Sequence, residues 1–105
     1  MEVILDTESA ERLLSEPLAI IFKHSRTCGV SVSALDEVLR FVSLRPEQKI
    51  HQVDVHNSKK ASDYIQEKTG VRHESPQLII LRYGKVVWSA SHRAITTKAL
   101  SVAIE

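Results

Sequence analysis

Two kinds of hydrophobic pattern alternate along the chain. Continuous apolar runs at 18–22 and 78–81 have the length of strands and the composition of strands that are buried on both faces. Between such runs, apolar residues recur every three or four positions, as in amphipathic helices. The pattern predicts, in chain order, a short strand over 3–5, a helix over 7–16, a strand over 18–22, a helix over 29–43, a strand over 50–55, a helix from Asn57 or Ser58 to Gly70, strands over 78–81 and 86–88, and a last helix that starts at Thr96 or Thr97.

The helix predicted over 29–43 has its larger apolar residues on one stripe. We expect this core-facing stripe to consist of Val32, Leu35, Leu39 and Val42. The charged residues Asp36, Glu37 and Arg40 fall away from the stripe.

The order of these elements predicts an α/β fold. Strands that alternate with helices give a parallel start to the sheet, and the tight turn at Tyr83-Gly84 adds an antiparallel hairpin at its end. The simplest closure is a thioredoxin-like three-layer sandwich, with a central mixed sheet and helices on both faces. A flavodoxin-like sheet fits less well because it has no place for the hairpin. We expect one domain over 1–105.

Composition narrows the function classes. The chain has 105 residues and a formal net charge of +1, so nothing in its charge indicates a nucleic-acid or membrane partner. No apolar run approaches the ~20 residues of a membrane-spanning helix. The first residues are too acidic for a secretory signal, so we expect a cytoplasmic protein.

Cys28 is the one cysteine of the chain. It lies between a predicted strand and the predicted start of a helix, the place where α/β sheets bind ligands. A helix N-terminus carries partial positive charge, which stabilises a thiolate and lowers the pKa of a thiol. Cys28 is therefore the candidate catalytic nucleophile. The alternative is a buried cysteine that acts only as a small hydrophobic residue.

The neighbours of Cys28 form a C-x-x-S sequence that ends at Ser31. Ser31 lies one helical turn further on, so its hydroxyl can donate toward the Cys28 sulfur, but it cannot resolve a mixed disulfide. The alternative is an ordinary serine in the first turn of a helix. His24 can stabilise the thiolate as an imidazolium, or it is a solvated loop histidine. Lys23 and Arg26 add positive charge nearby.

The second candidate element is Ser75-Pro76, directly before a predicted strand. A cis bond there would turn the Ser75 backbone N–H and C=O outward, where they could pair with an extended substrate segment. We expect the cis form; the alternative is a trans proline that simply begins the strand. His92 lines the same end of the sheet or caps the last helix. The histidine spacings match no metal-binding motif, so we expect no metal site.

Three separated segments resemble the YtxJ-like proteins, which are monothiol bacilliredoxins of the bacillithiol system: 27–31 (Thr-Cys-Gly-Val-Ser), 73–77 (His-Glu-Ser-Pro-Gln) and 91–96 (Ser-His-Arg-Ala-Ile-Thr). The resemblance implies a thioredoxin fold in which Cys28 removes bacillithiol from S-bacillithiolated client proteins. It implies bacillithiol as co-substrate, a low-molecular-weight thiol as partner and no tightly bound cofactor. The residues that it places around Cys28 are Thr27, Gly29, Val30 and Ser31.

Two further expectations follow from this resemblance. Members of the family usually have proline where Gly29 stands, and glycine loosens the first helical turn. Bacillithiol carries the carboxylates of a malate group, for which Arg26, Lys23 and Arg93 are candidate binding residues.

Two other functions remain open: a non-catalytic binding module in which Cys28 is inert, and a redox sensor that is modified at Cys28 without passing the group on.

Overall fold

A computed structural model describes residues 1–25 and 29–105; the side chain of Val30 is also outside the described part. Its elements are β1 (Glu2–Val3), α1 (Thr7–Leu14), β2 (Leu18–His24), α2 (Gly29–Leu44), β3 (His51–Asp54), α3 (Lys59–Thr69), β4 (Gln77–Arg82), β5 (Lys85–Ser91), the 3-10 turn η1 (His92–Ala94) and α4 (Thr97–Ala103). All the predicted helices and strands are present, with ends that differ by a few residues.

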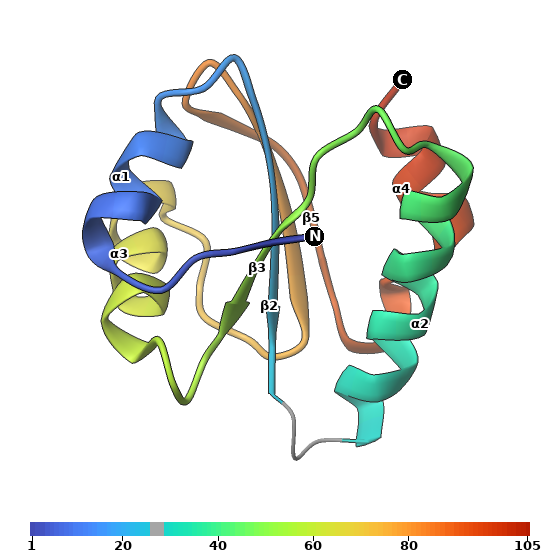
Figure 1. Cartoon of the computed structure of the whole chain (residues 1–105), viewed down its shortest axis with the longest axis horizontal. Coiled ribbons are helices and arrows are strands. Elements are labelled where there is room, and N and C mark those ends of the chain that lie inside the picture. Colours follow the sequence, from blue (N-terminus) through green and yellow to red (C-terminus); the bar gives the residue numbers. More distant parts are fainter. Residues whose placement is uncertain (26–28) are drawn as a thin grey trace.

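The sheet has the strand order β1-β3-β2-β4-β5. β1 and β2 run parallel to β3, whereas β4 runs antiparallel to both β2 and β5. Helices α1 and α3 cover one face, and α2 and α4 cover the other (Figure 1). The predicted three-layer α/β sandwich with a mixed sheet is therefore confirmed.

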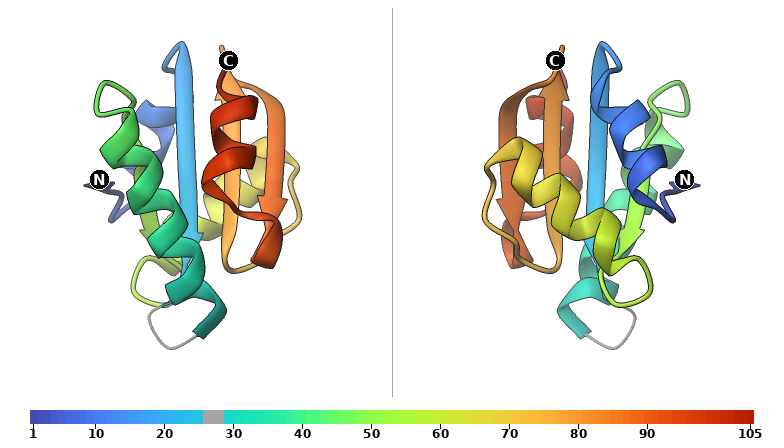
Figure 2. Two further views of the ribbon diagram at one scale, coloured as in Figure 1. Left: turned by 90° about the vertical axis from the view of Figure 1, so that its right-hand side faces the viewer. Right: turned by 90° about the vertical axis from the view of Figure 1, so that its left-hand side faces the viewer.

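Successive residues of β2 point alternately into two hydrophobic clusters. Ile20 and Phe22 pack in the cluster beneath α2 and α4, while Ala19 and Ile21 pack in the cluster beneath α1 and α3. The two helical layers that cover these clusters are seen from either side in Figure 2. Because both faces of the strand are buried, it has the continuous apolar sequence seen at 18–22.

Helix α2 packs on a different stripe from the predicted one. Val32 is 52% exposed and Leu39 is 47% exposed, so neither belongs to the core. The buried residues of the helix are Ser31, Ala34, Val38 and Phe41, with Leu35 and Val42 partly buried beside them. The prediction was wrong by one position, because the helix carries two adjacent apolar stripes and the packing of Val38 and Phe41 against the sheet buries the stripe at 31, 34, 38 and 41. None of the described helices is long and apolar enough to cross a membrane.

Strand β2 continues two residues further than predicted, through Lys23 and His24, and both side chains are buried. Lys23 points toward α3, where its Nζ donates to the Ser62 carbonyl oxygen at 2.9 Å and lies 3.4 Å from His73 Nδ1. Burial lowers the Lys23 pKa to about 8, although the Asp63 carboxylate opposes this shift. Burial and then the Lys23 charge lower the pKa of His73, so that a neutral imidazole can accept from the ammonium.

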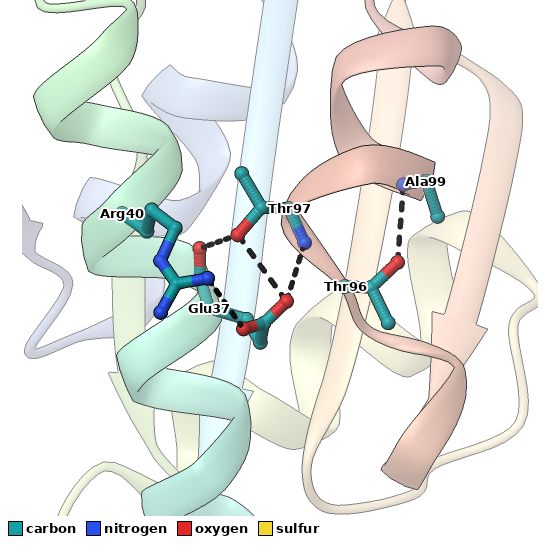
Figure 3. A network of polar contacts seen from close by, with 5 residues as sticks. All are labelled: Glu37, Arg40, Thr96, Thr97 and Ala99. Carbon is teal, nitrogen blue, oxygen red and sulfur yellow. Dashed lines mark hydrogen bonds and ion pairs between the residues drawn. The ribbon is translucent and has the colours of Figure 1, made fainter.

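A polar clasp joins α2 to α4 across their shared layer (Figure 3). The Thr97 N–H donates to Glu37 Oε1 at 2.9 Å, and the Thr97 hydroxyl donates to the Glu37 carbonyl oxygen at 2.9 Å. Arg40 lies 3.8 Å from the other Glu37 carboxylate oxygen, and Thr96 caps α4 by accepting from the Ala99 N–H at 3.1 Å. The Thr97 N–H is the main cause of the lowered pKa of Glu37, so the clasp stabilises the fold at neutral pH and weakens as pH falls through that lowered value.

We predict that Thr97→Val lowers the free energy of unfolding by about 1 kcal/mol, because it removes the hydroxyl whose hydrogen is shared between the Glu37 carbonyl oxygen and Glu37 Oε1, while retaining the shape of the residue and its backbone N–H. The measurement is urea unfolding followed by circular dichroism. The matched control is Lys98→Ala, an exposed position of the same helix outside the clasp. A Thr97→Val protein as stable as the control would contradict a stabilising clasp.

We predict that Lys23→Met changes how stability depends on pH. Between about pH 8 and pH 10.5 the unfolded chain holds the Lys23 proton and the folded chain does not, so the free energy of unfolding of the unmodified protein rises by up to about 3 kcal/mol. The Lys23→Met protein lacks this contribution. Urea unfolding of both proteins from pH 7 to pH 10.5 measures the difference, and parallel curves would show that Lys23 stays charged throughout.

Candidate functional site

Three segments that are distant in sequence meet at one end of the sheet. The antiparallel register of β4 on β2 places Gln77 opposite Lys23, so the Ser75-Pro76 segment lies beside the carboxyl end of β2. The register of β5 on β4 places Ser91 opposite Gln77, which brings η1 to the same end. Helix α2 begins there at Gly29, directly after Cys28 in the chain. Cys28, Arg26 and Thr27 lie outside the described residues, so their roles stay predictions.

The Ser75-Pro76 peptide bond is cis, as predicted. Pro76 is buried, and its carbonyl oxygen accepts from the His92 N–H at 2.9 Å. The Ser75 Oγ atom is buried and has no hydrogen-bond partner among the described residues. The bond from His92 fixes this proline segment to η1, so the two form one wall of the site.

The two ends of the segment that contains Cys28 are joined by a hydrogen bond. The Ser25 N–H donates to Ser31 Oγ at 3.2 Å, and both residues are buried. A hydroxyl that accepts in this way still has its own hydrogen to donate. The predicted bond from Ser31 to the Cys28 sulfur lies outside the described residues and stays a prediction.

His24 lies inside the protein and not in a solvated loop. Its ring stacks on Phe22 with centroids 5.2 Å apart, and its Nε2 lies 3.0 Å from Gln52 Oε1. Because a carbonyl oxygen only accepts, Nε2 carries a hydrogen in this arrangement. The alternative of a solvated histidine is wrong; a role for His24 in stabilising the thiolate stays a prediction. Sequence reasoning missed Gln52, because nothing in the pattern fixes the register of β3 against β2.

Lys23 does not serve the site in the way the sequence suggested. Its ammonium lies on the α3 face of the sheet, opposite to the face that α2 covers, and is fully buried. The expectation that it binds a substrate carboxylate is therefore wrong. It instead contacts His73 in the connection before β4. The backbone N–H of His73 also donates to Gln66 Oε1. Gln77 Nε2 donates to the Arg72 carbonyl oxygen of the same connection at 2.8 Å.

A groove of about 480 Å³ lies between the start of α2 and the connection from β5 to α4. Gly29 and Ala34 line it from α2, and His92, Arg93 and Ile95 line it from the connection. His92 adopts the left-handed conformation with φ 53°, which is uncommon for a residue with a side chain. Its Nδ1 lies 3.9 Å from Glu74 Oε2, the carboxylate next to Ser75. His92 therefore lies at the same end of the sheet as Ser75-Pro76, which is one of the two placements predicted for it.

Comparison with known proteins agrees with this arrangement. A solved structure described provisionally as an oxidoreductase with a thioredoxin fold superposes with a TM-score of 0.91 at 30% identity, covering 99% of this chain and 93% of that one. Thioredoxins of Fasciola hepatica and Plasmodium falciparum share the fold at 20% and 15% identity, each with a TM-score of 0.76, 99% coverage of this chain and 96% of theirs.

The family model described as monothiol bacilliredoxin BrxC matches residues 3–100. Together with the fold, this match supports a thiol–disulfide redox function, and it agrees with a chain that has one cysteine. The chain belongs to the monothiol bacilliredoxin family.

Proposed function

We propose that this protein is a cytoplasmic thiol–disulfide oxidoreductase that removes bacillithiol from mixed disulfides of client proteins through Cys28. The observation that carries the proposal is the family match over 3–100 in a chain with a single cysteine. The surroundings support it, because Cys28 follows β2 and directly precedes α2 at the end of the sheet where the cis Ser75-Pro76 bond lies.

The proposed reaction has two exchange steps. The Cys28 thiolate attacks the bacillithiol sulfur of the mixed disulfide; a new disulfide forms between Cys28 and bacillithiol, and the client leaves as a thiolate that takes a proton from water. The thiolate of a second low-molecular-weight thiol then attacks the bacillithiol sulfur on Cys28. The second thiol and bacillithiol depart joined by a new disulfide, and Cys28 is released as the thiolate. No net oxidant is needed, because each step breaks one disulfide and forms another.

The described residues have distinct parts in this proposal. The partial positive charge at the N-terminus of α2 favours negative charge at the preceding residue, Cys28. The bond from Ser25 to Ser31 holds the ends of the segment that contains Cys28. Ser75 offers backbone N–H and C=O groups with which an extended client segment can pair in the manner of a strand.

We predict that Cys28 is alkylated with a midpoint in the range ~3.5–7.5 of thiols at helix N-termini, well below the ~8.5 of free cysteine. Addition of bacillithiol disulfide gives one adduct by mass, and free thiol removes it. A client protein that carries bacillithiol is restored with turnover, and Cys28→Ser abolishes this.

Each alternative gives a different result in that experiment. A midpoint near 8.5 without an adduct would overturn the proposal in favour of a binding module. An adduct that forms but is never passed to a second thiol would overturn it in favour of a sensor.

We predict that Gly29→Ala raises the free energy of unfolding by about 0.5 kcal/mol. A Cβ at Gly29 meets no atom of the described residues within 4 Å, and Gly29 is not in the left-handed region, so alanine mainly removes freedom from the unfolded chain. The matched control is Gly70→Ala, where a Cβ also has open space but φ is +73°, so a loss of about 1 kcal/mol is expected. If Gly29→Ala also destabilises in urea unfolding, the first turn of α2 requires glycine.

A further inference from the structure

We propose that the groove between α2 and the connection from β5 to α4 binds the carboxylate portion of the low-molecular-weight thiol, and that Arg93 is the residue that recognises its charge. This inference rests on the proposed function and adds to it a site for the leaving and entering thiol. It concerns which thiol the protein accepts, whereas the exchange chemistry itself depends on Cys28.

The position of the groove fits a ligand that is joined to Cys28. One wall begins at Gly29, which follows Cys28 by a single peptide unit, about 3.8 Å between Cα atoms. The volume of about 480 Å³ is within the range of about 300–1,000 Å³ that is usual for small-molecule sites. A group that extends from the Cys28 sulfur along α2 would therefore enter a space of suitable size.

The opposite wall is rigidly placed. The His92 N–H donates to the Pro76 carbonyl oxygen at 2.9 Å, and Thr96 begins the capped first turn of α4. Ala34 and Ile95 give the groove an apolar part, and both are buried. Ser33 and Thr96 add hydroxyl groups that can donate to an oxygen of the ligand.

The charges around the groove favour an anion. Arg93 is exposed, and no described residue forms a hydrogen bond or ion pair with its guanidinium. Glu37 is the acidic residue of the lining, but its carboxylate accepts from the Thr97 N–H and lies 3.8 Å from Arg40 (Figure 3). His92 faces Glu74 at 3.9 Å. Arg93 is thus the cation of this groove that has no described partner, and a guanidinium binds carboxylates through paired hydrogen bonds.

Two other pockets formed by the described residues give weaker grounds for a binding site. The cavity between β1 and α1 is lined by Glu2 and Arg12, whose charges are already paired with His51 and Glu8. The apolar hollow beside Trp88 and Val102 has no feature that indicates an occupant. Among the described residues, the groove at Arg93 is the one that combines a wall directly after Cys28 in the chain with a charge that has no described partner.

The first test compares two adducts of one client protein, one with bacillithiol and one with 2-mercaptoethanol, which has no carboxylate. We expect Arg93→Gln to lower kcat/KM about tenfold for the bacillithiol adduct, as for the loss of a charged hydrogen bond. The mercaptoethanol adduct should change less than twofold. Lys98→Gln is the matched control, since it removes a nearby exposed charge outside the groove. Equal losses for both adducts, or no loss for either, would overturn the proposal.

The second test does not depend on turnover. The Cys28→Ser protein is titrated with S-methyl bacillithiol and followed by amide NMR. We expect shifts at Gly29, Ala34 and Ile95, with a Kd about tenfold higher when Arg93→Gln is added. Binding of this kind without transfer by the unmodified protein would refute the proposed function and leave the groove assignment standing. Transfer by the unmodified protein, with no binding in the groove, would refute the groove assignment alone.

Discussion

The antiparallel pairing of β4 with β2 is the constraint on which the site depends. With Lys23 opposite Gln77, the residues before β4 must lie at the carboxyl end of β2, and the same pairing carries β5 and η1 to that end. A shift of one residue would move each side chain of one strand into the cluster on the opposite face, where it would meet different neighbours and the present packing of both clusters would be lost. Burial of the core therefore also fixes the position of the cis proline relative to the start of α2.

The last two residues of β2 show how this strand continues beyond its apolar run. Lys23 and His24 point to opposite faces, and each finds a specific partner: the Ser62 carbonyl oxygen for Lys23 and Gln52 for His24. A buried polar group without a partner destabilises a fold. The Lys23 ammonium and the His24 ring avoid this cost because each is paired with a neighbouring element, α3 for Lys23 and β3 for His24. Lys23 holds the connection before β4, and His24 contacts β3 beneath α2. Polar residues thus replace apolar packing where the strand reaches the site.

Much of this arrangement could be predicted from the sequence, because its signals are local. The two apolar runs, the end of α3 at the left-handed Gly70 and the Tyr83-Gly84 turn all depend on near neighbours. The face of α2 was mispredicted by one position, since the helix carries two adjacent apolar stripes and residue types alone do not specify which of them contacts the sheet. The partner of Lys23 lies 39 residues away and that of Thr97 lies 60 residues away. Such contacts follow from strand register and helix packing, which residue types alone do not specify.

Glu37 connects the stability of the fold with the electrostatics of the site. Its carboxylate holds α4 against α2, which sets the separation of the two walls of the groove. The same hydrogen bonds lower the pKa of Glu37 and so keep its carboxylate charged at neutral pH, while Arg40, 3.8 Å away, offsets part of the repulsion that this charge would exert on an anion there. Because that charge is already engaged, Arg93 does not need to pair with it and remains available to a ligand. The contact that holds α4 against α2 therefore also affects the charge that an entering thiol meets in the groove.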